Sequence, residues 1–327
     1  MRDVMQPAPL PRARPVLMLA VLALTIAACS GAAFTPVPTG PGIVAEVASY
    51  ELVAGQPGRL LVALIAADNR WLSFGTVPVR FAYLGDGGSS PSPATVPQPA
   101  TATFLAISGS PDGRGASPEL TLPADGRGVY AVEPVTFERA GYWRVIAEGS
   151  LADGHPFAAD AAFTVLQKPL IVSVGDVAPR TDNPIVGSPG VPLSAIDSRA
   201  TDGAGVPDPE LHSTTIADAI AAGHPTLVVF STPVFCVSRF CGPVTDLVAD
   251  LASKYGDRAD FIHIEIYRDF QAGVVNQAAL DWLMPPTGDL REPWTFLIGA
   301  DGRVAGSWDT VVARSEIEPL LQALPPK

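Results

Sequence analysis

Cysteine is scarce in this chain, with only three residues, Cys29, Cys236 and Cys241, among 327. None of them lies in residues 43–166, which excludes an internal disulfide from that region. Basic residues are also few, because 21 Lys and Arg stand against 33 Asp and Glu and give a net charge of −12. Such an acidic surface repels a phosphate backbone, so we exclude a nucleic-acid partner.

The N-terminal region lacks a hydrophobic run long enough to span a bilayer comfortably. Its apolar stretch, residues 16–28, follows Arg2, Arg12 and Arg14, a pattern typical of an export signal. The last four residues, Ile-Ala-Ala-Cys ending at Cys29, resemble the lipobox of bacterial lipoproteins.

The lipobox resemblance implies that residues 1–28 are a signal peptide and that Cys29 carries the lipid. The protein would then be lipid-anchored at the extracytoplasmic face of the cell membrane. An ordinary signal peptide or a buried cysteine is the alternative. Residues 29–42 are rich in Pro, Gly and Thr and are interpreted as a flexible tether.

Residues 43–166 are predicted to form an all-β domain, because helical periodicity is weak and short alternating segments recur between turns. These segments lie at residues 59–65, 77–83, 103–107, 142–147 and 157–166. The pattern resembles an antiparallel β-sandwich of the immunoglobulin-like type, without its inter-sheet disulfide. No catalytic constellation is found there, which leaves binding or spacing as its function.

Residues 167–214 are rich in Pro, Gly and Asp and are interpreted as a linker, and residues 215–327 alternate helical and strand patterns. Thr215, with Asp218 three residues later, is expected to cap a helix that Gly223 ends. The later elements are expected at 227–230 (strand), 243–255 (helix), 260–267 (strand), 276–283 (helix), 294–298 and 304–308 (strands), with a last helix opened by a capping box of Ser315 and Glu318. This order predicts one sheet with helices on both faces.

The two remaining cysteines lie between a buried strand and a helix, whose N–H groups and dipole stabilise a thiolate. If Cys29 is the anchor, Cys236 and Cys241 are an even pair in an oxidising compartment, as a disulfide requires. They would close a loop of only six residues, which gives little entropic stabilisation and favours a reactive disulfide. An inert structural disulfide is the alternative.

Cys241-Gly242-Pro243 resembles the active-site segment of the thioredoxin superfamily, in which Cys-Gly-Pro-Cys opens a helix after a strand. Val244 stands where that family has its second cysteine. Cys236, five residues upstream, is therefore the only candidate partner, in a C-x4-C pair.

The resemblance covers about residues 174–324 and implies a thioredoxin-like α/β fold. It implies a thiol–disulfide oxidoreductase that acts on protein thiols and disulfides without a cofactor. Cys241 would attack a substrate disulfide and Cys236 would resolve the mixed disulfide. Pro293 falls where the superfamily has its cis-proline, beside the reactive sulfur.

The buried acid of thioredoxins is absent, because Val229 occupies the aligned position. Glu265 and His263, on the next strand, are the candidate proton carriers. A second hypothesis is copper or other soft-metal handling, with Cys236, Cys241 and His263 as ligands. A third is a non-catalytic surface lipoprotein that only binds a partner.

Overall fold

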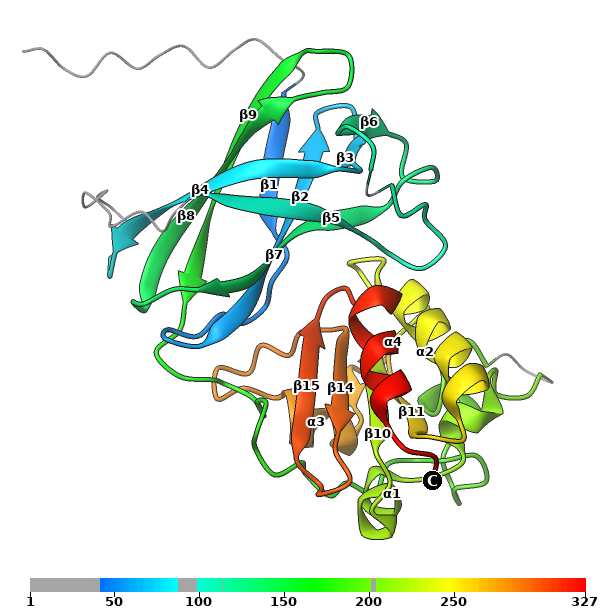
Figure 1. Cartoon of the computed structure of the whole chain (residues 1–327). Helices are drawn as coiled ribbons and strands as arrows, with labels where there is room; N and C mark the ends of the chain where they lie inside the picture. The colour runs from blue at the N-terminus through cyan, green and yellow to red at the C-terminus, as the bar shows by residue number, and fades with distance from the viewer. Residues whose placement is uncertain (1–41, 88–98, 114, 201–203) are drawn as a thin grey trace, which may run out of the picture. The chain divides into compact units, whose positions relative to one another are not determined.

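The computed structural model describes residues 42–87, 99–113, 115–200 and 204–327 (Figure 1). The predicted signal peptide, Cys29 and nearly all of the tether lie outside these residues. Within the described part of the chain, no helix has the length and apolar character needed to cross a membrane.

Nine β-strands are described between Ile43 and Val165: β1 (Ile43–Val47), β2 (Pro57–Ala66), β3 (Trp71–Ser73), β4 (Thr76–Gly85), β5 (Ala100–Ala106), β6 (Glu119–Thr121), β7 (Gly128–Thr136), β8 (Gly141–Ser150) and β9 (Pro156–Val165). The prediction of a β-rich N-terminal region is thus confirmed. All five predicted segments lie within or overlap a strand.

These strands form one hydrogen-bonded sheet in the order β6-β3-β2-β7-β5-β4-β8-β9, with β1 paired to β2. An immunoglobulin-like sandwich has two separate sheets, so the hydrogen bonding differs from that expectation. Register shifts between Gly58 and Leu60 in β2, and between Tyr83 and Gly85 in β4, mark the irregularities at which strands bend. The larger core cluster of the sheet includes Phe81, Phe104, Tyr130, Phe137 and Trp143. A second cluster joins residues of β2, β5 and β7 to Phe240 and Val311.

The rest of the described chain contains η1 (Leu193–Ala195), η2 (Pro209–His212), α1 (Ile216–Ala222), β10 (Thr226–Ser231), α2 (Cys241–Tyr255), β11 (Asp260–Glu265), β12 (Tyr267–Asp269), β13 (Val274–Val275), α3 (Gln277–Leu283), β14 (Trp294–Ile298), β15 (Val304–Asp309) and α4 (Arg314–Ala323). Four strands form a sheet in the order β11-β10-β14-β15. β10 is parallel to β11 and antiparallel to β14, which is antiparallel to β15.

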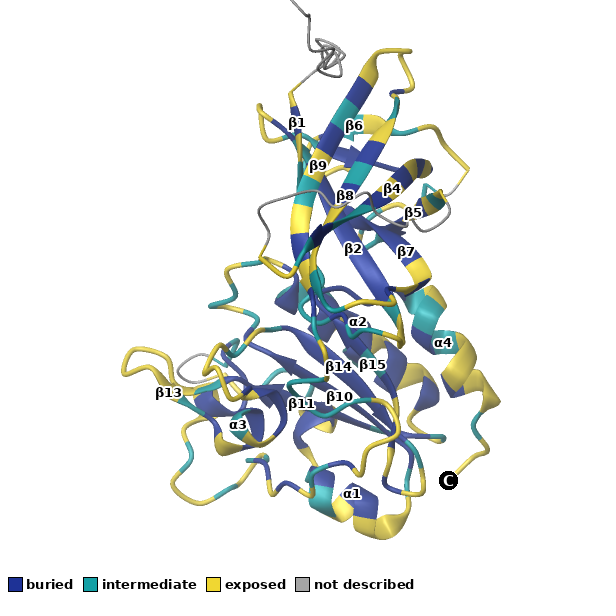
Figure 2. Cartoon of the chain, turned by 90° about the vertical axis from the view of Figure 1, so that its left-hand side faces the viewer, coloured by how far each residue is buried: buried dark blue, intermediate teal, exposed yellow. Residues whose placement is uncertain are grey.

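Helices pack on both faces of this sheet (Figures 1 and 2). Leu227 and Val229 of β10 pack with α2 and α4, whereas Val228 and Phe230 pack with α1 and α3. Every residue of β10 is buried, as its unbroken apolar run predicts for a strand covered on both sides. After the carboxyl end of β10 at Ser231, the chain continues through the loop that holds Cys236 and into α2.

The ends of α1 follow local rules that were predicted. The Thr215 Oγ1 accepts a hydrogen bond from the Asp218 N–H at 3.0 Å. Gly223 has a φ of 71°, the left-handed conformation that glycine adopts without a Cβ clash.

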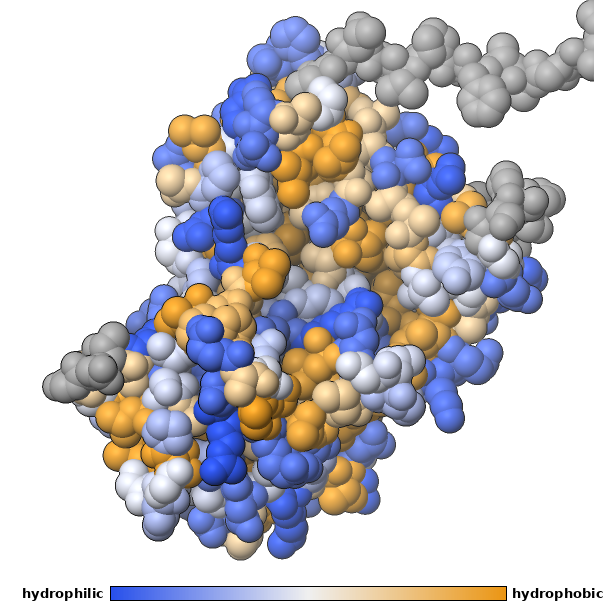
Figure 3. Space-filling model, turned by 180° about the vertical axis from the view of Figure 1, so that it is seen from behind, coloured by the Kyte–Doolittle hydropathy of each residue, from blue (hydrophilic) through white to orange (hydrophobic). Residues whose placement is uncertain are grey.

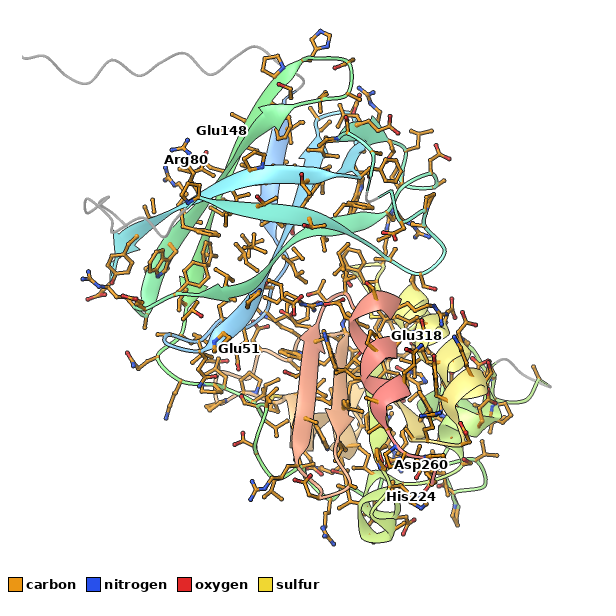
Figure 4. All side chains as sticks on the ribbon, in the orientation of Figure 1. Glu51, Arg80, Glu148, His224, Asp260 and Glu318 are labelled. Atoms are coloured by element: carbon orange, nitrogen blue, oxygen red, sulfur yellow. A yellow bond between two sulfur atoms is a disulfide. The ribbon has the colours of Figure 1, made fainter. Side chains whose placement is uncertain are left out.

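The starts of α2 and α4 differ from those predicted from the sequence. α2 begins at Cys241 rather than at Pro243, so Cys241 is itself the first helical residue. The predicted capping box of Ser315 and Glu318 is wrong, because the Glu316 carboxylate accepts from the Ala313 N–H at 2.6 Å. Glu318 instead accepts hydrogen bonds from Lys254 and Tyr255 of α2 (Figure 4).

Candidate functional site

The two cysteines predicted to pair are joined by a disulfide, with a Cα–Cα distance of 6.0 Å. The loop between them continues from β10, and the Cys236 N–H donates to the Thr232 carbonyl at 3.0 Å. Arg239 has a φ of 64° just before α2 begins. Cys241 then starts that helix, where N–H groups have no partner within the helix.

The two cysteines differ in exposure. Cys241, the first residue of α2, is 0% exposed, whereas Cys236 is half-buried. The Ser238 Oγ lies 3.2 Å from the Cys236 Sγ, within reach of a hydrogen bond to that sulfur. Since an attacking reagent must approach a disulfide sulfur directly, Cys236 is the sulfur that a substrate can reach.

Cys236 opens on a pocket of about 1030 Å³. Its lining includes Phe240 from the same loop, Tyr267 from β12, and Arg291 and Glu292 just before β14. The pocket thus brings a disulfide sulfur, a carboxyl group and a guanidinium cation to one surface.

Exposed apolar side chains flank Cys236 in the sequence, at Val234 (55% exposed) and Val237 (96%). Phe235 stacks on Phe270 with ring centroids 4.0 Å apart. Apolar groups also reach the surface elsewhere, interspersed with hydrophilic ones, as Figure 3 shows for one face. Exposed apolar side chains gathered beside the disulfide are typical of an interaction surface.

Pro293 immediately precedes β14, and the Glu292–Pro293 peptide bond is cis, as expected from its position in the sequence. The proline is buried, and its carbonyl accepts from the Thr310 N–H at 2.9 Å. This contact fixes the backbone that carries Glu292 against the end of β15.

Glu292 is a titratable group that the sequence analysis missed. Burial, followed by repulsion from Glu265, raises the pKa of Glu292 to about 8. Its carboxylate accepts from the Thr232 N–H, while its Oε2 is buried with no hydrogen-bond partner in the described structure. Thr232 also binds Cys236 through its carbonyl, so a neutral acid lies next to the cysteine loop at pH 7. An acid directly before the expected cis-proline is the sequence feature that could have indicated it.

The two predicted proton carriers, Glu265 and His263, are buried in β11 and do not line the pocket around Cys236. Glu265 accepts a hydrogen bond from the Ser198 N–H at 2.8 Å. His263 lies beside Asp197 and His212 rather than in a group with the two cysteines. The proposed soft-metal ligand set is therefore not brought together in the described structure.

Comparisons with protein-family models, curated proteins and solved structures found no match to this chain. A disulfide open at one sulfur, a helix start at the other and an acid with a pKa of about 8 can together exchange disulfides and move the proton that this exchange requires.

Proposed function

We propose that this protein is a membrane-anchored, extracytoplasmic thiol–disulfide oxidoreductase with a thioredoxin-like domain. The observation that carries the proposal is the Cys236–Cys241 disulfide, which ends at the first residue of α2 and opens on a pocket through Cys236. The element order from β10 to α4 and the cis bond before Pro293 support the thioredoxin-like assignment. The β-rich region would act as a spacer or binding module, and its immunoglobulin-like character stays a prediction.

In the proposed reaction, a substrate thiolate attacks the Cys236 Sγ and forms a new sulfur–sulfur bond. The Cys236–Cys241 bond breaks, and its electron pair leaves on Cys241 as a thiolate. The first-turn N–H groups and dipole of α2 stabilise this leaving group, and a thiol of lower pKa leaves faster.

A second substrate thiolate then attacks the substrate sulfur of the mixed disulfide and releases Cys236 as a thiolate. The substrate is oxidised to a disulfide, and the protein is reduced to a dithiol. Glu292, neutral at pH 7, donates a proton to Cys236 in this direction and takes one back in reverse. Substrate reduction follows the same steps in reverse.

This assignment exchanges the roles expected from the resemblance, in which Cys241 attacks. The helix start favours a thiolate on Cys241, but burial prevents a protein substrate from reaching it. We therefore assign contact with substrate to Cys236 and the stabilised thiolate to Cys241.

Replacing Glu292 with Gln tests the proton-transfer step. The variant should exchange disulfides at least about 100-fold more slowly near pH 7, as expected when a general acid–base group is lost. The inflection near pH 8 in the wild-type rate profile should disappear. Rates with a model dithiol substrate between pH 6 and 9 measure this. Glu318→Gln, which changes an acid bound to Lys254, is the control (Figure 4). An unchanged inflection in Glu292→Gln would assign the titration to another group.

The same variant has a predicted effect on stability. The pKa of Glu292 is raised on folding, so its favourable contribution is complete at acidic pH, below the ordinary glutamate range. That contribution is lost as pH rises through about 8. Glu292→Gln should therefore lose less stability than wild type between pH 6 and 9, by an amount on the order of 2 kcal/mol. Urea unfolding at both pH values measures the difference, and parallel losses in the two proteins would contradict it.

Membrane anchoring is tested by replacing Cys29 with Ser. A lipobox requires the cysteine thiol for acylation, so the variant should lose lipid labelling and leave the membrane fraction. Ser30→Ala, which keeps the thiol, should remain membrane-bound. Retention and labelling of Cys29→Ser at the wild-type level would exclude the lipoprotein assignment.

A further inference from the structure

A buried group of metal-binding side chains lies apart from the disulfide. It consists of Asp197, just after η1, His212 at the end of η2, and His263 in β11. One ligand atom from each residue lies within 4.8 Å of the other two. The three side chains are 0% exposed. Three segments far apart in the sequence thus place two imidazoles and a carboxylate around one point.

The hydrogen bond made by His263 fixes which of its ring nitrogens is free to bind. Its Nε2 lies 3.1 Å from the Ser231 carbonyl oxygen, which can only accept, so Nε2 carries the hydrogen. In the neutral ring Nδ1 then has a lone pair, which faces the Asp197 Oδ2 at 3.4 Å. Two lone pairs at this distance repel, so either a proton on Nδ1 or a metal cation must lie between them. A histidine that donates its other N–H to a backbone carbonyl is the usual arrangement of a metal ligand.

His212 provides the second, independent observation. Both of its ring nitrogens are buried and have no hydrogen-bond partner among the described residues. A buried polar group without a partner is costly, and such groups are rare in native proteins. Its Nε2 lies 3.4 Å from the same Asp197 Oδ2 that faces His263. One cation would give a partner to the His212 Nε2, to the His263 Nδ1 and to this oxygen.

The distances indicate which coordination geometry fits. Tetrahedral zinc, with bonds of about 2.0–2.1 Å at about 109°, places its ligand atoms about 3.3–3.4 Å apart. Octahedral coordination at about 2.1 Å places adjacent ligand atoms about 3.0 Å apart. Both histidine nitrogens lie 3.4 Å from the Asp197 oxygen, the spacing of two tetrahedral ligand atoms, and all three ligand atoms lie within 4.8 Å of one another.

Arg199 is the other charged partner of Asp197. Its Nη2 donates to the Asp197 Oδ2 at 2.7 Å, and its Nε donates to the Oδ1 at 3.1 Å. The arginine charge is itself shared with Asp208 at 2.8 Å and Asp246 at 3.4 Å. Arg199 thus orients the Asp197 carboxylate. The negative charges of Asp208 and Asp246 offset the repulsion between Arg199 and a bound cation.

We propose that Asp197, His212 and His263 bind a zinc ion. Two imidazoles and one carboxylate are a common ligand set for zinc. The ion would join the stretch around η1 and η2 to β11 of the central sheet. This inference does not depend on the proposed redox function, because no cysteine belongs to the group.

Zinc binding by the full-length chain in detergent, with the disulfide intact, tests the proposal. Wild-type protein stripped with a chelator should take up one zinc ion per chain in competition with a chromogenic zinc chelator. Zinc should also raise its Tm, because a ligand that binds only the native state stabilises it. Asp197→Asn, His212→Gln and His263→Gln should each lower zinc affinity by at least about tenfold and reduce the rise in Tm.

His224→Gln is the matched control, because His224 pairs with Asp260 at 2.9 Å but belongs to no group of three metal-binding side chains among the residues described (Figure 4). It should bind zinc like wild type. X-ray absorption of zinc-loaded wild type needs no variant and should show nitrogen and oxygen ligands without sulfur. The proposal is overturned if wild type fails to retain zinc, if all three variants bind as wild type does, or if sulfur ligates the metal.

Discussion

Cys241→Ser should trap a stable mixed disulfide with substrate, whereas Cys236→Ser should form none. In Cys241→Ser the half-buried Cys236 can still attack the disulfide of an oxidised substrate, but the Cys241 thiol that would displace this substrate in the reducing direction is gone. In Cys236→Ser the remaining thiol is fully buried. Both variants should lose exchange activity on the order of 10³-fold or more, as expected when a nucleophile is removed. Non-reducing gels and turnover of a reduced unfolded protein measure the two effects.

The thiol pKa values separate this assignment from its alternatives. In Cys236→Ser, the pKa of Cys241 should lie below the free value of about 8.5, because it begins α2. A pH series of iodoacetamide rates gives both values, and Cys29→Ser, which keeps the pair, is the control. Trapping through Cys241 would instead support the order expected from the resemblance. If neither single-cysteine variant traps substrate or shows a lowered pKa, the non-catalytic binding protein becomes the better interpretation.

Arg59→Met should destabilise the fold by about 3–5 kcal/mol, the usual result of leaving buried charges unpaired. Arg59, in β2, is 9% exposed. Its guanidinium lies 2.6 Å from the Glu316 carboxylate and 3.3 Å from that of Asp309, and it donates to the Val311 carbonyl at 2.6 Å. Burial raises the pKa of Asp309 even beside this cation. The loss of stability relative to wild type should therefore be smaller at pH 5 than at pH 8, because Asp309 can be neutral at the lower pH.

Urea unfolding of matched variants measures the effect. Arg80→Met is the control, because Arg80 pairs with Glu148 at 2.7 Å with both side chains 51% exposed (Figure 4). An exposed pair contributes at most about 1 kcal/mol. Changing Asp309 to Asn and Glu316 to Gln together with Arg59→Met should recover much of the lost stability. Equal small losses in Arg59→Met and Arg80→Met would show that the buried ion group contributes little.

Local physical rules in the sequence determined most elements of the fold. Thr215 and Gly223 bound α1 because capping and left-handed backbone depend only on neighbouring residues. The unbroken apolar run of β10 predicted a strand buried on both faces, which the structure confirms. The pairing of Cys236 with Cys241 followed from counting cysteines, and the disulfide is present. Each of these inferences needed only a short stretch of chain or a composition.

Only the tertiary structure decided which groups share a surface or a buried site. Cys236 and Cys241 differ in exposure because α2 covers one sulfur and the pocket opens at the other. Glu292 acquires its raised pKa from burial and from Glu265 on another strand. His263 joins Asp197 and His212 through segments distant in the chain. Periodicity and capping report how a segment folds, whereas exposure, pKa and ligand sets depend on which segments pack together.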